Sequence, residues 1–342
     1  MIAVHAGLHK TGSSSIQVAL ELARNRNGRC VITPNPTDDR TEQGWADRTK
    51  ALADSPDAIF SDESLLGSPY DGYQAAPQRA SLLRNALRGV PYQLIVYVRP
   101  QLDWLPSVYL QGVQEGRTIA AERFWTGIKD EPLLEWSRLL DVLRKESGAE
   151  RVVVRAHTRS RDAVADFFKV CGLGKPPRIG KGMIRINASI AADQAPLLMA
   201  LNELPEVGFD QRVQFRRVFQ QILAPGASLD LSPFPESVQR EIAERFRNDW
   251  QILTDSVVGY DPEEAQVFQN ESQRWLEQPR LFGGATLDDS AIQQEALRAL
   301  HVLSLKQDVE DPSLLKRLIT KIRDDPGGLP QALLRAVRRS SK

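Results

Sequence analysis

The sequence has few of the residues that metal sites are built from. Its 342 residues include only four histidines and two cysteines, Cys30 and Cys171. No metal-ligand spacing links these residues, so we expect no metal site. The two thiols are far apart in the sequence, and we expect both to be buried and unreactive.

Long hydrophobic runs and an excess of either charge are also missing. No apolar stretch approaches the roughly 20 residues that cross a bilayer, and no basic segment followed by an apolar one opens the chain. We therefore expect no membrane span, no signal peptide and a cytoplasmic location. Lysine plus arginine and aspartate plus glutamate both number 44, so the formal net charge is zero. This balance argues against nucleic-acid binding, while a local site for a small anion stays open, as does homo-oligomerisation.

The first half of the chain alternates short β-rich runs with helical sequence. Because the runs are nearly continuous in apolar character, they are typical of strands covered on both faces. Strands alternating with helices predict an α/β fold with a mainly parallel sheet. The expected strands are 1–6, 30–33, 58–60, 92–98 and 151–156. The expected helices are about 13–25, 77–88, 101–115, 132–147 and 160–171.

After about residue 190 the β-rich runs stop. Segments 235–253 and 290–305 each place apolar residues on one helical face, a pattern that more often means core packing than a binding surface. We therefore divide the chain into an α/β core, 1–190, and a mainly helical extension, 191–342.

The loop after the first strand, "HAGLHKTGSSSIQ" at 5–17, has the chemistry of an anion site. Gly7 and Gly12 let the backbone curl so that successive amides face inward, and the following helix adds the positive end of its dipole. Lys10 adds a charge. The hydroxyl donors are Thr11, Ser13, Ser14 and Ser15.

This loop differs from the common nucleotide loops. In the G-x-x-x-x-G-K-[ST] pattern a lysine occupies the position of Ser13, and the G-x-G-x-x-G pattern is absent. The segment "KTGSS" at 10–14 instead resembles the 5′-phosphosulfate loop, K-[ST]-G-[ST]-[ST], of sulfotransferases that use 3′-phosphoadenosine 5′-phosphosulfate (PAPS). The resemblance implies a P-loop-type three-layer sandwich with PAPS as donor, adenosine 3′,5′-bisphosphate (PAP) as product, and no metal.

A second segment carries the same resemblance. In "LIVYVRPQLDWLPSVYLQ", 94–111, Arg99 ends a strand and Ser107 follows eight positions later. In the sulfotransferase family this pair binds the 3′-phosphate, for which a guanidinium provides a planar fork of donors. The resemblance covers about residues 1–190 and is specific for the donor. It leans towards the bacterial and carbohydrate-type branches, since the tryptophan that follows the lysine loop in many cytosolic members is missing.

A third segment fits less closely. The stretch "IRINASIAAD", 184–193, resembles an N-x-S segment of several bacterial members. By this resemblance Asn187 and Ser189 approach the nucleotide, together with Lys181 or Arg185. The alternative is a basic loop followed by an ordinary helix cap.

Sulfuryl transfer is an in-line displacement that depends on positioning and charge stabilisation. By the resemblance, Lys10 interacts with the bridging oxygen that leaves with the nucleotide. A general base belongs near the carboxyl ends of the strands. We rank Glu63 first for its reach, Asp62 second and His9 third, whereas His157 is expected to be structural or on the rim.

Two other classes of function stay open. A P-loop kinase or phosphotransferase requires a lysine at position 13 and a magnesium carboxylate. A non-catalytic nucleotide-fold module predicts a damaged donor site, whereas Lys10, Arg99 and Ser107 are all present. For a sulfotransferase, the acceptor is a hydroxyl or amine of a small molecule, lipid or carbohydrate, which the sequence does not identify.

Overall fold

The computed structural model describes residues 1–24, 30–33, 49–50, 52–55, 57–158, 161–177, 190, 192, 195–202, 231–258, 261–277 and 283–284 of the chain. Three candidate nucleotide-binding residues, Arg185, Asn187 and Ser189, lie outside these ranges, as does the apolar stripe at 290–305. Contacts divide the chain into two units. The first contains the described residues of 1–108, 127–187 and 241–280, and the second contains those of 109–126, 188–240 and 281–342.

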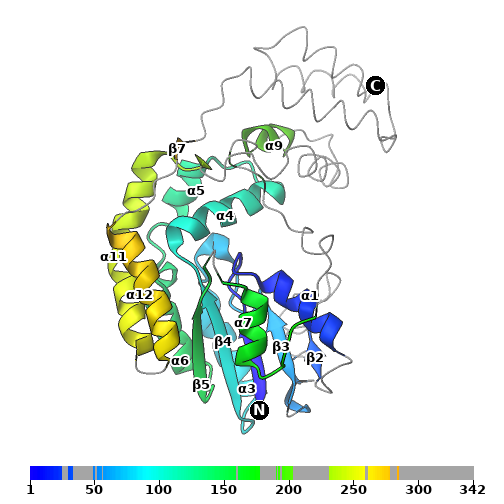
Figure 1. Cartoon of the computed structure of the whole chain (residues 1–342). Helices are drawn as coiled ribbons and strands as arrows, with labels where there is room; N and C mark the ends of the chain where they lie inside the picture. Colours follow the sequence, from blue (N-terminus) through cyan, green and yellow to red (C-terminus); the bar gives the residue numbers. More distant parts are fainter. Residues whose placement is uncertain are drawn as a thin grey trace, which may run out of the picture. The chain divides into compact units, whose positions relative to one another are not determined.

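The first unit is built on a five-stranded sheet in which every neighbouring pair is parallel (Figure 1). The order of the strands is β2-β3-β1-β4-β5. Their bounds are β1 Ile2–Ala6, β2 Val31–Ile32, β3 Ile59–Asp62, β4 Tyr92–Val98 and β5 Arg151–Ala156. The α/β class and the parallel sheet predicted from the apolar runs are therefore confirmed.

The central strand of the sheet is β1, which pairs with β3 on one side and β4 on the other. All residues of β1, β3 and β4 are buried, because helices cover both faces. The sequence predicted a strand at 58–60 with Asp62 just after it, whereas β3 extends to Asp62, which is its last residue. The loop that follows β1 consequently begins at the middle of the sheet.

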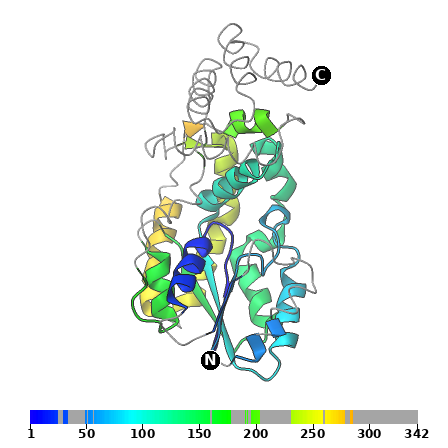
Figure 2. The same ribbon diagram turned by 90° about the vertical axis from the view of Figure 1, so that its right-hand side faces the viewer.

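Two pairs of helices cover the two faces of this sheet. Figure 2 shows α1 and α7 on one face, and α3 and α6 on the other. These helices span Ser13–Ala23, Ala163–Val170, Ala76–Ala86 and Trp136–Glu146, respectively. A further helix, α12 (Pro262–Glu277), packs on the edge strand β5, so part of the segment expected to form an extension groups with the sheet.

The remaining elements connect these layers or belong to the second unit. Helix α4 covers Gln101–Gln114, α5 covers Ala121–Ile128 and α11 covers Glu236–Val258, and short 3-10 helices are η1, Pro69–Asp71, and η2, Pro132–Leu134. The second unit also contains α9, Ala195–Asn202, and the two-residue strands β6, Leu231–Ser232, and β7, Gly283–Gly284, which pair in parallel. Its apolar contacts centre on the rings of Tyr109, Phe124 and Phe234.

The structure bears on two expectations from the sequence: that both cysteines are buried and that no segment spans a membrane. Cys171 is buried as expected, but Cys30 is exposed, because it stands at the edge of the sheet just before the short strand β2. Among the described helices, none is both long enough and apolar enough to span a bilayer.

Candidate functional site

The predicted site residues follow the carboxyl ends of neighbouring strands. The loop after β1 contains Lys10, β3 ends in Asp62, and Arg99 and His157 directly follow β4 and β5. Open parallel sheets bind ligands at this edge, where connections leave adjacent strands toward opposite faces. The helix after β1 is α1 on one face, while the connection from β3 passes through α3 on the other.

The loop after β1 is tightly curled by residues in the left-handed region of backbone conformation. Lys10 has φ 64° and Gly12 has φ 88°. At Gly7 there is no room for a side chain, because a β-carbon would lie 2.1 Å from Ser13 Oγ. Inside the curl, Thr11 Oγ1 donates to the Leu8 carbonyl oxygen at 2.6 Å and Ser13 Oγ donates to it at 3.4 Å. These two hydroxyls therefore fix the shape of the loop.

Helix α1 begins directly at the end of this loop. Its N-cap residue, Gly12, provides no side-chain cap, and its first turn contains no acidic residue. The amides of a first helical turn have no partner within the helix, and the helix dipole is positive there. Ser14 and Ser15, which are half-buried, lie in this turn. The helix start therefore has the electrostatic character that attracts an anion.

Arg99 connects the two predicted anion-binding segments. Its Nη1 donates a hydrogen bond of 3.1 Å to Ser107 Oγ and one of 3.3 Å to the main-chain oxygen of Lys10. Ser107 Oγ in turn donates to the Asp103 carbonyl oxygen at 3.1 Å, one helical turn earlier in α4. Arg99 and Ser107 are half-buried. The two motifs, read separately in the sequence, thus meet at one guanidinium.

Two buried tryptophans hold the main chain of these same segments. Trp104 Nε1 donates to the carbonyl oxygen of His9 at 2.7 Å, and Trp136 Nε1 donates to that of Arg99 at 2.8 Å. The two indoles pack edge to face, with ring centroids 4.9 Å apart. Because both rings are fully buried, they fix the distance between the loop after β1 and the end of β4.

The support extends to helix α11. One carboxylate oxygen of Asp249, Oδ2, accepts hydrogen bonds from the main-chain amide of Trp136 at 2.7 Å and from Gln101 Nε2 at 2.8 Å. Its other oxygen accepts from the amide of Ser137 at 2.9 Å. Asp249 therefore caps the start of α6, as an acceptor at a helix N-terminus does.

Histidines lie beside and beneath the loop after β1. Burial, together with the positive charge of Arg99, lowers the pKa of His157 to about 4. A β-carbon on Gly12 would lie 3.6 Å from His157 Nε2 and 3.1 Å from Ala163 Cβ, so both residues pack closely on the loop. Beneath it, fully buried His5 contacts Ser61 Oγ through Nδ1 at 2.8 Å, and burial lowers its pKa to about 3. Both imidazoles are neutral near pH 7.

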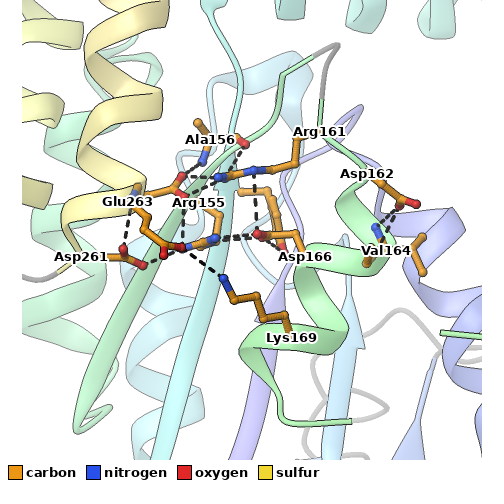
Figure 3. A network of polar contacts seen from close by, with 12 residues as sticks. Arg155, Ala156, Arg161, Asp162, Val164, Asp166, Lys169, Asp261 and Glu263 are labelled. Atoms are coloured by element: carbon orange, nitrogen blue, oxygen red, sulfur yellow. Dashed lines mark hydrogen bonds and ion pairs between the residues drawn. The ribbon is translucent and has the colours of Figure 1, made fainter. Parts of the chain in front are cut away.

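A buried network of charges fixes the strand end and the helix that lie beside the loop (Figure 3). Arg155 of β5 donates to Asp166 of α7 through Nε at 3.0 Å and through Nη2 at 2.5 Å. Glu264 of α12 accepts from Arg161 at 2.7 Å and from the amide of Ala156 at 2.5 Å. Burial alone raises the pKa of Asp166, but hydrogen bonds from Arg155 and Tyr97 bring it below its ordinary value. The network thereby anchors α7, which presents Ala163 to Gly12.

The three candidate bases have different environments. Asp62 is buried, and its Oδ1 accepts a hydrogen bond from the amide of Ser64 at 2.7 Å. Glu63 is half-buried, and its charge acts on the hydroxyl of Tyr73. His9 is half-buried too, and its main-chain amide donates to Tyr73 Oη at 3.2 Å. Glu63 therefore combines partial exposure with a position near the loop after β1.

No protein-family model, curated protein or solved structure matches this chain. Among the described residues, no group of three or more histidine, cysteine, aspartate or glutamate side chains is arranged to hold a metal ion.

Several residues of this site were not singled out from the sequence. Tyr73, Trp104, Trp136 and Asp249 all support the segments that contain Lys10 and Arg99. For Trp104 a signal existed, because it lies between Arg99 and Ser107 in the quoted motif. Tyr73 and Asp249 reach the site from distant parts of the chain, and no local pattern marks them.

Proposed function

We propose that this chain is a sulfotransferase that moves a sulfuryl group from PAPS to a hydroxyl or amine of a small-molecule, lipid or carbohydrate acceptor. The observation that carries the proposal is the contact of Arg99 with both motifs. Its Nη1 donates to Ser107 Oγ at 3.1 Å and to the Lys10 carbonyl oxygen at 3.3 Å. A ligand with one phosphate at the start of α1 and another at Arg99 matches this arrangement of donors.

The residues of the site fit such a nucleotide. The loop after β1 and the uncapped start of α1 suit the 5′-phosphosulfate, since Lys10 and Gly12 curl the backbone there. Arg99 and Ser107 suit the 3′-phosphate. We extend the proposal to a P-loop-type sandwich with a helical C-terminal extension, and to Arg185, Asn187 and Ser189 as further contacts of the nucleotide.

In the proposed reaction the donor supplies the sulfuryl group and leaves as PAP. The bond between sulfur and the bridging oxygen breaks while the acceptor oxygen or nitrogen bonds to sulfur. Lys10 neutralises the charge that develops on the bridging oxygen, and Glu63 takes the proton of the acceptor. The amides of the loop and the hydroxyls of Ser14 and Ser15 hold the 5′-phosphate.

Calorimetric titration with PAP and with ATP tests this proposal. We expect PAP to bind and ATP to bind poorly, because the loop lacks a lysine at position 13. Arg99→Ala should lower the affinity for PAP by roughly 10- to 100-fold, since it removes charge-assisted hydrogen bonds to phosphate. Glu63→Gln should slow turnover and leave the affinity for PAP nearly unchanged.

Arg88 provides a matched control for the substitution at Arg99. It is an exposed arginine that precedes β4, whereas Arg99 follows the same strand at the opposite edge of the sheet. Arg88→Ala should therefore bind PAP as the unmodified chain does. Equal binding of ATP and PAP, insensitive to Arg99, would replace the proposal with a kinase-type function.

A further inference from the structure

Tyr73 has an unusual backbone conformation directly beside the proposed donor loop. Its φ is 62°, a left-handed value that is costly for a bulky residue and persists only where surrounding contacts enforce it. Its main-chain amide donates to the Ser68 carbonyl oxygen at 2.9 Å and to Asp71 Oδ1 at 3.1 Å, which closes the turn after η1. The ring is fully buried and lies against Trp104 and Trp136.

The hydroxyl of this tyrosine faces His9. The His9 main-chain amide donates to Tyr73 Oη at 3.2 Å, and His9 Nδ1 lies 3.3 Å from the same oxygen. Within the described part of the chain, these two nitrogens are the hydrogen-bonding partners of Tyr73 Oη. Burial, with a contribution from the charge of Glu63, raises the pKa of Tyr73 far above its ordinary value, so the hydroxyl keeps its proton.

This geometry assigns the direction of the second hydrogen bond. A buried hydroxyl proton requires an acceptor, since leaving it unpaired costs free energy. The main-chain nitrogen of His9 is a donor and accepts nothing, so the Tyr73 proton points to the lone pair of His9 Nδ1. A neutral imidazole that accepts at Nδ1 has its own proton at Nε2.

We infer that Tyr73 is a positioning residue that holds the neutral form of His9 in the Nε2–H tautomer, so that this form acts as a hydrogen-bond donor and not as the base. The inference rests on the proposed function for its role in sulfuryl transfer. Nε2 then has no lone pair for an acceptor proton, and the lone pair of Nδ1 is taken by Tyr73. Among the three candidate bases, this leaves the carboxylates of Asp62 and Glu63, of which Glu63 is the more exposed.

The tautomer defines what His9 can do in the proposed reaction. A neutral imidazole that donates from Nε2 stabilises negative charge without taking up a proton. His9 immediately precedes Lys10, and Trp104 fixes its carbonyl oxygen. We assign the Nε2–H of His9 to the oxygens of the transferring sulfuryl group, where it complements the charge of Lys10.

Nitrogen NMR of the uniformly labelled chain tests the tautomer without any ligand. We expect the His9 Nδ1 to resonate as an unprotonated nitrogen and Nε2 as a protonated one, with the signals identified by their loss in His9→Gln. Tyr73→Phe, which keeps the ring and removes the hydroxyl, should convert His9 to a mixture of tautomers. Tyr92→Phe is the control, because it removes a buried hydroxyl that donates to Ser147 at the opposite edge of the sheet. A proton on Nδ1 in the unmodified chain would overturn the inference.

The turnover of two variants of His9 distinguishes a role as hydrogen-bond donor from a role as base. The amide nitrogen of glutamine reproduces an N–H donor near the position of Nε2 but accepts no proton. Because His9 acts as a donor, the His9→Gln variant should retain its turnover rate within roughly tenfold. The His9→Ala variant should lose roughly 100-fold in turnover rate. An equal loss in both variants would contradict the donor role. Failure of the unmodified chain to bind PAP would overturn the proposed function instead, and would leave the measured tautomer standing.

Discussion

Arg99 Nη1 lies 3.3 Å from the main-chain oxygen of Lys10, although 89 positions separate the two residues in the sequence. The same nitrogen reaches Ser107 Oγ, so one side chain joins the loop after β1 to helix α4. In the proposed function this side chain binds a phosphate of the nucleotide, so a change at either end of the connection should weaken nucleotide binding more than it lowers the stability of the fold.

Ser107→Ala should weaken the 3′-phosphate contact selectively. We expect the affinity for PAP to fall roughly tenfold, because a hydrogen bond to a charged group is lost. The affinity for adenosine 5′-monophosphate, which has no 3′-phosphate, should not change. Calorimetry with both nucleotides measures the difference. Ser81→Ala removes a hydroxyl on α3 that donates to Glu146, and it should leave both affinities intact. Equal losses for both nucleotides would mean that Ser107 acts through the loop.

Gly7→Ala should distort the loop after β1. The new β-carbon would lie 2.1 Å from Ser13 Oγ and 2.9 Å from Ser13 Cβ, and neither atom is at the end of a long flexible side chain. We expect a loss of about 1–3 kcal/mol in the free energy of unfolding, together with weaker binding of PAP. Urea denaturation measures the first quantity.

The helical residue Gly127 gives the reference for the change at Gly7. A β-carbon there meets nothing within 4 Å, so Gly127→Ala should be neutral or slightly stabilising. Replacing Ser13 by glycine in the Gly7→Ala background should recover part of the lost stability. No recovery would show that the clash lies elsewhere.

Glu264→Gln should destabilise the first unit strongly. The fully buried carboxylate accepts from Arg161 and lies 3.1 Å from Arg155 Nη1, so glutamine removes charge-assisted hydrogen bonds in a buried site, while Arg155 keeps its pair with Asp166. We expect a cost of about 1.5–3 kcal/mol in urea denaturation. Glu263→Gln, next to it on α12, breaks an exposed pair with Lys169 and should cost at most about 1 kcal/mol. Similar costs for the two variants would refute the assigned role of the network.

The depressed pKa of His157 gives stability a specific pH dependence. The pKa is about 4 in the folded chain and 6.5 ordinarily, so the unfolded chain takes up a proton first as the pH falls. This contribution is complete above pH 6.5, decreases between pH 6.5 and 4, and is lost below that. In His157→Gln the free energy of unfolding should therefore fall less steeply across this interval, as denaturation at several pH values measures. Parallel pH profiles for the two proteins would contradict the assignment.

The sheet was predictable because its signals are local. The runs at 92–98 and 151–156 are apolar over their whole length, and they form β4 and β5 with the expected bounds. The loop after β1 was recognisable from adjacent residues for the same reason. Helix α5, 121–128, was missed even though it has a strong apolar face, because it is short and follows the expected helix at 101–115 closely.

The supports of the site depend on contacts that no local pattern encodes. Tyr73 meets His9 across 64 positions, and Asp249 meets Trp136 across 113. In the sequence, Asp249 reads as one polar residue of an amphipathic helix. Only the packing of α11 in the first unit gives the carboxylate of Asp249 its three hydrogen-bond donors. The division at residue 190 and the roles of Arg185, Asn187 and Ser189 stay predictions.

The indole hydrogen bonds of Trp104 and Trp136 have an optical consequence. Indole emission responds to the polarity and hydrogen bonding around the ring, and these two rings are bonded to the carbonyl oxygens of His9 and Arg99. Any movement of either segment as a molecule arrives therefore changes the fluorescence of the chain itself. The protein thus has its own spectroscopic probe, so screening of candidate ligands needs no attached dye.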